Sequence, residues 1–153
     1  MNIITRLHDL NITIPDVNPP LAAYQPGILA GEFIYVSGQL PIKEGKLLYC
    51  GKLGSNLTID DGKAACRIAV INCLAVLKNF LNTWDDLDQI IKLTGYINSE
   101  SNFGEHAAVL NGASELLEQV LSVKGRHARA AVGVNSLPMN AACEVEMIAR
   151  IKV

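Results

Sequence analysis

One arginine and two glutamates stand inside segments that are otherwise apolar. Residues 126–153 read RHARAAVGVNSLPMNAACEVEMIARIKV, where Arg129 opens one apolar run and Glu144 and Glu146 lie within the next. Charged side chains are seldom buried without a partner, so we predict that Arg129 pairs with Glu144. Two roles fit such a pair. It is either a structural ion pair between strands or subunits, or an anion site in which the arginine fork binds a carboxylate and the glutamate handles protons.

The remaining histidines and cysteines form no catalytic or metal-binding motif. His8, His106 and His127 lie in separate segments, so we predict no metal site and interpret His127 as a bystander. The four cysteines include no CxxC pair, and Cys66 and Cys73 lie two helical turns apart. We therefore predict reduced cysteines that act as small apolar residues. The sequence contains no P-loop, Rossmann fingerprint, HExxH or GxSxG motif.

The elements that must position these residues follow from the hydrophobic pattern. In chain order we predict a short N-terminal helix, a hairpin turning at 30–32, a strand near 47–53, a helix over 59–82, a strand over 88–97, a helix after 102, and strands over 129–134 and 142–151. Thr58 and Asn102 are the expected N-caps of the two longer helices. Gly38 ends a strand, either as a turn residue or as a place where a ligand approaches the backbone. This order predicts an α+β fold in which two helices cover one sheet face.

The composition indicates an oligomer of a small, weakly charged domain. Of 153 residues, 50% are hydrophobic and only 18% are charged. A lone domain of this size exposes too much surface to hide that apolar material, and one sheet face has no helix to cover it, so we expect further copies of the chain there. The net charge of −2 gives no electrostatic reason to expect nucleic acid. No apolar stretch is long enough to cross a membrane and the N-terminus lacks a signal-peptide pattern, so we predict a cytoplasmic protein.

The pattern AYQPG…FIYVSGQLP…RHARAAVGVNSLPMNAACEVEMIA resembles the RidA (YjgF) family, also called the ribonuclease L-PSP or translation initiation inhibitor family. The resemblance covers residues 18–153 of a single predicted domain, 1–153, in which 1–17 form an N-terminal extension. It implies a chorismate-mutase-like α+β sandwich with a mixed sheet, and a homotrimer with ligand sites between neighbouring subunits. It also implies imine/enamine deaminase activity, which hydrolyses 2-imino acids to 2-oxo acids and ammonia without metal or organic cofactor.

The resemblance also implies roles for individual residues. Arg129 corresponds to the arginine that binds the substrate carboxylate, and Glu144 to the glutamate that orients water. Tyr24 and Gly38 correspond to substrate-binding positions, the glycine through its backbone. Asn111 corresponds to the asparagine at the start of the second long helix of the family.

Ala131 marks a departure from the best-studied branch, which has a cysteine two residues after the arginine. The alanine excludes thiol chemistry at this position and leaves a backbone contact with the substrate. Together with the N-terminal extension and extra residues before Asn111, it indicates a divergent branch of the family.

Two alternative functions remain at the level of sequence. The same site is compatible with a non-catalytic module that binds a small carboxylate as a sensor or scaffold, or with an endoribonuclease or translation inhibitor. Glu144 favours catalysis, because binding a carboxylate requires only the arginine and backbone donors. The acidic charge balance and the lack of a basic, aromatic-rich groove argue against RNA.

Overall fold

The computed structural model describes residues 2–17 and 23–152. Its elements are α1 (Ile3–Asp9), β1 (Gly27–Ala30), β2 (Phe33–Gln39), β3 (Ile42–Lys43), β4 (Lys46–Leu47), α2 (Ile59–Lys78), β5 (Leu87–Asn98), α3 (His106–Leu121), β6 (Ala128–Val134) and β7 (Cys143–Ile151), with short 3-10 turns at Trp84–Asp86, Ser122–Gly125 and Pro138–Asn140. Within the described ranges, no helix is both long and apolar enough to cross a membrane.

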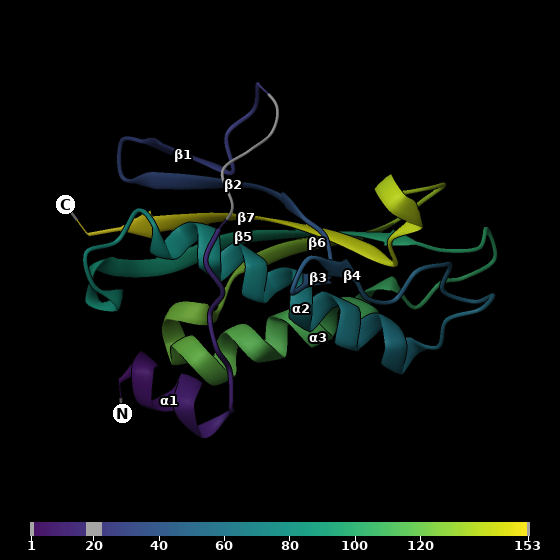
Figure 1. The fold of residues 1–153 in the computed structure, drawn as a ribbon, viewed down its shortest axis with the longest axis horizontal. Coiled ribbons are helices and arrows are strands. Elements are labelled where there is room, and N and C mark those ends of the chain that lie inside the picture. The colour runs from purple at the N-terminus through teal and green to yellow at the C-terminus, as the bar shows by residue number, and fades with distance from the viewer. Residues whose placement is uncertain (1, 18–22, 153) are drawn as a thin grey trace.

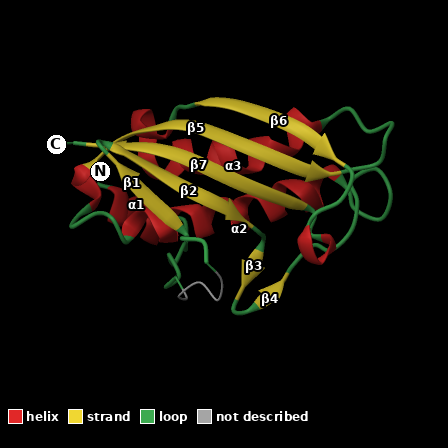
Figure 2. Cartoon of the chain, turned by 90° about the horizontal axis from the view of Figure 1, so that it is seen from above, coloured by secondary structure: helices red, strands yellow, loops and turns green. Residues whose placement is uncertain are grey.

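The main sheet has five strands in the order β1-β2-β7-β5-β6. All neighbours are antiparallel except β5 and β6, which run parallel because α3 carries the chain back between them. Figure 1 shows two layers, with α2 and α3 beneath the sheet and α1 against the helices. Figure 2 looks onto the opposite face, where none of the described helices covers the strands. The predicted α+β fold, a mixed sheet with two helices on one face, is confirmed.

The start of α2 follows from its cap. The hydroxyl of Thr58 accepts a hydrogen bond from the Asp61 N–H at 3.2 Å, and the Asp61 carboxylate accepts one from the Thr58 N–H at 2.8 Å. These bonds lower the pKa of Asp61. The helix ends at Lys78, four residues earlier than predicted, because the amides of Phe80 and Leu81 bond three residues back and tighten the last turn.

Two other predictions about the elements are wrong. The strand near 47–53 is mostly loop, because Tyr49 and Gly51 have φ values of 62° and 134°, which strands do not accommodate. Asn102 does not cap α3, which begins at His106 with Glu105 as its N-cap and no side-chain cap. Instead Asn102 lies in a turn closed by a 3.0 Å hydrogen bond from the Phe103 N–H to the Glu100 carbonyl.

The two long helices meet through a glycine. A Cβ atom on Gly112 of α3 would lie 2.2 Å from the backbone carbonyl oxygen of Lys63 in α2, so the backbones touch where no side chain fits. The core fills the space between these helices and the sheet, with α2 buried on more than one side, as its wide apolar surface predicts.

We expect Gly112→Ala to destabilise the fold by about 1–3 kcal/mol, because the added methyl must push α3 away from α2. The free energy of unfolding, measured by urea denaturation, checks this. Gly104→Ala is the matched control, since a Cβ there meets nothing within 4 Å. Equal stability of the two variants would contradict the close backbone contact.

Candidate functional site

Arg129 and Glu144 lie on opposite faces of the sheet. Glu144 stands in register with Tyr96, and so does Val132, which is 42% exposed on the open face. Arg129 stands in register with Leu93, which is fully buried beneath the helices. Paired residues of neighbouring strands point to the same side, so the two charged side chains point apart. The predicted pairing of Arg129 with Glu144 is therefore wrong within one chain, and neither has an ion-pair partner in the part of the chain that the structure describes.

Glu144 packs against the backbone of β2 at Gly38. The register of β2 against β7 shifts between Val36 and Gln39, which is the signature of a β-bulge. A Cβ atom on Gly38 would lie 2.0 Å from Oε1 of Glu144, so the carboxylate occupies the space of the missing side chain. Gly38 is thus a place of close approach within a strand rather than a turn residue.

The surroundings of Glu144 favour its protonated form. Partial burial raises the pKa of this carboxyl, and the neighbouring charge of Glu146 raises it further. Glu146 itself accepts a 3.0 Å hydrogen bond from the hydroxyl of Tyr96. A carboxyl with a raised pKa exchanges protons closer to neutrality, as a general acid or base requires.

The segment that carries Tyr24 is tied to the strand that carries Gly38. The Ser37 hydroxyl donates to the Gln25 carbonyl at 2.6 Å, and the Ser37 N–H donates to the Pro26 carbonyl at 2.8 Å. Tyr24 itself is 61% exposed. The chain therefore brings together Gly38, Glu144 and the segment that carries Tyr24. We name Tyr24, Gly38 and Glu144 the glutamate group.

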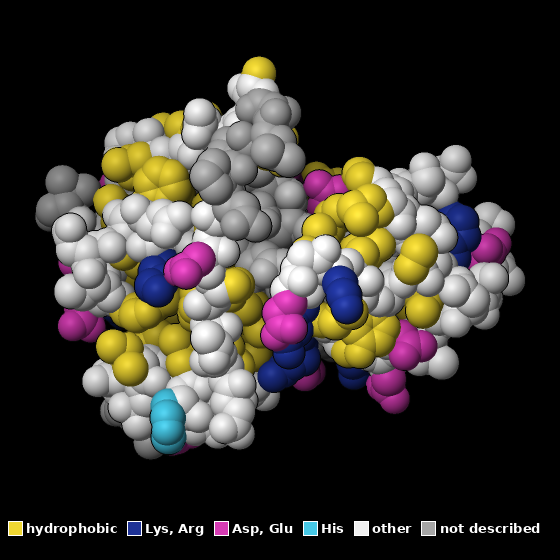
Figure 3. All heavy atoms as spheres, in the orientation of Figure 1, with side chains coloured by type: hydrophobic (Ala, Val, Ile, Leu, Met, Phe, Trp, Pro, Cys, Tyr) yellow, Lys and Arg dark blue, Asp and Glu magenta, His cyan; other side chains and the backbone are white. Residues whose placement is uncertain are grey.

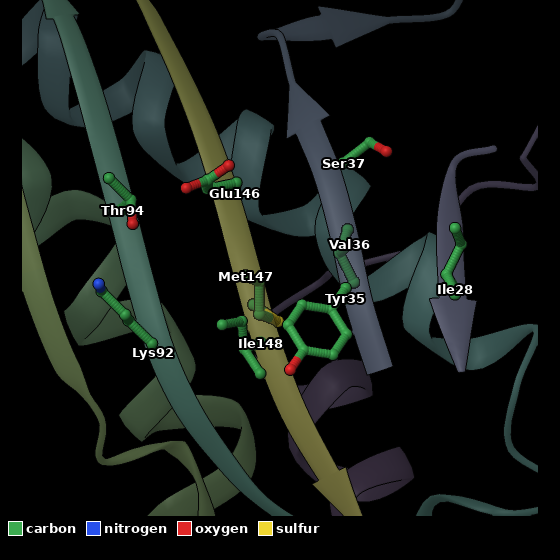
Figure 4. Close-up of a pocket in the computed structure, with 9 residues that line it drawn as sticks. All are labelled: Ile28, Tyr35, Val36, Ser37, Lys92, Thr94, Glu146, Met147 and Ile148. Atoms are coloured by element: carbon green, nitrogen blue, oxygen red, sulfur yellow. The ribbon is translucent and has the colours of Figure 1, made fainter. Parts of the chain in front are cut away.

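A hollow of about 290 Å³ lies on the open face beside the glutamate group. Figure 4 shows its lining, drawn from four strands: Ile28, Tyr35, Val36, Ser37, Lys92, Thr94, Glu146, Met147 and Ile148. Two lining residues lie close in sequence to the glutamate group. Ser37 directly precedes Gly38, and Glu146 follows Glu144 by two residues. The alternation of β7 already places Glu146 on the face of Glu144, but nothing in the sequence identifies Lys92 and Thr94 as its neighbours across the sheet.

Arg129 points toward α3 on the helix-covered side. Its guanidinium donates to the Ser114 hydroxyl at 3.0 Å and to the Ala107 carbonyl at 3.3 Å. Asn111 lies four residues after Ala107 and three before Ser114, so these positions share one stripe of the helix. Ala131, two residues along β6, points to the same side and packs partly buried against the core. Arg129, Asn111 and Ala131 form what we name the arginine group.

Two contacts of this region were not predicted from the sequence. Ser114 was not identified, although its helical spacing from Asn111 indicates that it lies on the same stripe. His127 was interpreted as a bystander, yet its Nε2 lies 3.0 Å from the Ser114 hydroxyl that Arg129 also contacts. His127 lies immediately before β6, two residues ahead of Arg129.

We expect Gly38→Ala to displace the Glu144 carboxylate and to impair any function of that carboxylate, while costing little stability because a side chain, not backbone, must move. Thermal unfolding and activity, measured side by side, check this. Gly31→Asn is the control: Gly31 has φ of 62°, which asparagine tolerates, and a Cβ there meets nothing within 4 Å. An active Gly38→Ala protein would show that the position of Glu144 is unimportant.

Comparisons with known proteins agree with the fold and the predicted resemblance. Residues 4–151 match the family model described as "YjgF/chorismate_mutase-like, putative endoribonuclease". Protein TCP17 of Trypanosoma cruzi is 35% identical over 97% of this chain and 94% of its own length. The crystal structure of Atu1372 from Agrobacterium tumefaciens, a protein described as of unknown function, is 40% identical with a TM-score of 0.92 and covers 98% of this chain and 92% of its own. That of a "putative endoribonuclease" from Shewanella oneidensis is 35% identical with a TM-score of 0.94, covering 99% and 100%. The chain is a member of the YjgF/chorismate mutase-like family.

Proposed function

We propose that the chain assembles as a homotrimer, in which the arginine group of one subunit and the glutamate group of its neighbour complete each site. The separation of Arg129 and Glu144 on opposite faces carries this proposal. No single chain presents both side chains to one small substrate, whereas Arg129 lies on an edge strand that a second copy can reach. The proposed activity is the hydrolysis of 2-imino acids to 2-oxo acids and ammonia.

The open sheet face supports the assembly. It exposes large apolar side chains, with Ile28 56%, Tyr35 48% and Val132 42% exposed. Neighbouring apolar side chains on an uncovered sheet are typical of an interface between subunits. In a closed cyclic assembly every copy is in the same environment. The open sheet face of each subunit would therefore be covered by its neighbours.

Arg129 would bind the substrate carboxylate. A guanidinium has five N–H donors, and the contacts to Ser114 and Ala107 engage one donor each on two different nitrogens. The remaining donors can form the parallel pair of hydrogen bonds that a carboxylate accepts. Asn111, on the same helical stripe, would donate its side-chain amide to the same ligand.

Glu144 would handle the water and the protons. A protonated imine is electrophilic at carbon, so water held by Glu144 can add to that carbon while the carboxylate takes the proton of the water. The same proton then passes to the nitrogen of the tetrahedral intermediate. As the C–N bond breaks, Glu144 takes the remaining hydroxyl proton, so that the C=O bond of the 2-oxo acid forms and ammonia leaves. The raised pKa of Glu144 suits both halves of this exchange.

The endoribonuclease description of several relatives is the competing function. RNA binding depends on basic side chains that gather without acidic ones between them. On the face in Figure 3, Lys and Arg side chains lie beside Asp and Glu side chains, between hydrophobic areas. The chain also carries 13 basic residues against 15 acidic ones, so we favour a small carboxylate as the ligand.

We expect the purified protein to accelerate ammonia release from 2-imino acids generated in situ by an amino acid oxidase. Arg129→Ala should lower kcat/KM roughly 10- to 100-fold through lost charge-assisted hydrogen bonds, and Arg129→Lys should be intermediate because it keeps only the charge. Glu144→Gln should lower kcat roughly 10²- to 10⁴-fold with less effect on KM, since the amide cannot accept the proton.

Wild-type protein without activity above the uncatalysed rate would refute the hydrolase. If it nevertheless bound a 2-oxo acid in an Arg129-dependent way, the non-catalytic carboxylate-binding module would stand instead. Cleavage of RNA that Arg129→Ala abolishes would favour the endoribonuclease.

A second experiment tests the division of the site between subunits. Arg129→Ala and Glu144→Gln chains are each nearly inactive, but mixed trimers should contain some sites with both native residues. With random assembly from equal amounts, about one quarter of the sites are complete, so roughly a quarter of wild-type activity should return. Mixing Glu144→Gln with Glu144→Ala is the control and should restore none. No recovery from verified mixed trimers would place both residues in the same chain's site.

A further inference from the structure

A chain of hydrogen bonds links Arg129 through Ser114 and His127 to the backbone carbonyl of Gly125. Nη1 of Arg129 lies 3.0 Å from the Ser114 hydroxyl oxygen, which lies 3.0 Å from Nε2 of His127. Nδ1 of His127 lies 2.5 Å from the backbone carbonyl oxygen of Gly125. Three elements are joined in this way: α3, the 3-10 turn Ser122–Gly125 and the segment leading into β6.

The chemistry of the end groups fixes the direction of every bond. A carbonyl only accepts, so Nδ1 of His127 carries a proton and donates to Gly125. A guanidinium only donates, so the Ser114 oxygen accepts from Arg129. The Ser114 hydroxyl can therefore give its own proton to Nε2 of His127, which accepts it when the imidazole is neutral. All donors and acceptors of this chain are then satisfied at once.

The electrostatics favour that neutral imidazole. Burial lowers the pKa of His127, the Gly125 carbonyl partly opposes this, and the positive charge of Arg129 lowers the pKa further. A protonated ring would turn Nε2 into a donor and leave the Ser114 proton without its acceptor. The geometry and the charge therefore support the same arrangement.

We propose that Ser114 and His127 are positioning residues that hold the guanidinium of Arg129 in the orientation that receives a substrate carboxylate. This inference rests on the proposed role of Arg129 as the carboxylate-binding residue. Arg129 is an exposed residue on an edge strand, and within the described ranges it has no acidic partner to orient it. A long side chain in that setting samples many rotamers, and the bonds to Ser114 and Ala107 restrict them before the ligand arrives.

The test measures binding of pyruvate, the simplest stable 2-oxo acid, by calorimetric titration of the assembled protein. Ser114→Ala removes both bonds of the hydroxyl, and His127→Asn keeps a donor toward Gly125 but removes the acceptor for Ser114. Each should raise the Kd of pyruvate roughly three- to tenfold, as expected for one side chain that must be immobilised on binding. Ser114→Thr and His127→Gln, which retain a hydroxyl and a possible acceptor, should recover most of the affinity.

A second serine–histidine pair, in which Ser99 follows β5 and His106 begins α3, supplies a matched control. The Ser99 hydroxyl lies 3.0 Å from Nε2 of His106 but does not contact Arg129. Ser99→Ala removes a similar bond and should leave the Kd of pyruvate unchanged. Nitrogen-15 NMR of the imidazoles gives a second readout: His127 should be the neutral tautomer protonated at Nδ1, and its Nε2 resonance should move in Ser114→Ala but not in Ser99→Ala.

The outcomes separate this inference from the proposed function. If Arg129→Ala weakens pyruvate binding but Ser114→Ala and His127→Asn bind as the wild type does, the positioning role is overturned and the carboxylate site stands. If Arg129→Ala binds pyruvate as tightly as the wild type, the carboxylate site itself fails, and the positioning role fails with it. Thermal unfolding checks that each variant is folded. Only variants that remain folded and assembled enter the comparison.

Discussion

The alternation of side chains along β5, β6 and β7 is the constraint on which the rest of the structure depends. Because β5 lies between the other two strands, its register with each neighbour decides which residues share a face. That register places Arg129 beside Leu93, toward α3, and Glu144 beside Tyr96, toward the open face. A slip of one residue in β6 would reverse the direction of Arg129 and remove its contacts with the helix.

Glu144 is held by a local irregularity of β2, and Arg129 is held by a polar stripe on α3. Packing of the domain alone requires neither feature. The β2 bulge and Gly38 make room for the Glu144 carboxylate, which burial and Glu146 disfavour in its charged form. The polar positions Asn111 and Ser114 replace apolar residues on the side of α3 that faces β6. Such departures from simple core packing are typical of places where function rather than stability selects the residue.

The elements were predicted well from the sequence where capping residues or a sustained hydrophobic pattern marked them. The helix after Thr58, the hairpin at Gly31 and the strands that carry Arg129 and Glu144 were all predicted, because capping chemistry and alternation report on neighbouring residues. The pairing of Arg129 with Glu144 within one chain was wrong, because register between strands is set by contacts far apart in the chain. The bond between Ser114 and His127 was also not predicted, since it depends on how α3 lies over β6.

The contact at Gly112 has a mechanical consequence. The glycine lies between Asn111 and Ser114 in α3, and its backbone rests directly on α2, so this part of α3 can neither slide nor rotate without separating the helices. The helix surface that Arg129 contacts is therefore a stiff support joined to the core. Any movement at this surface must then come from the loops around it or from the domain moving as a rigid body, and not from this helix yielding.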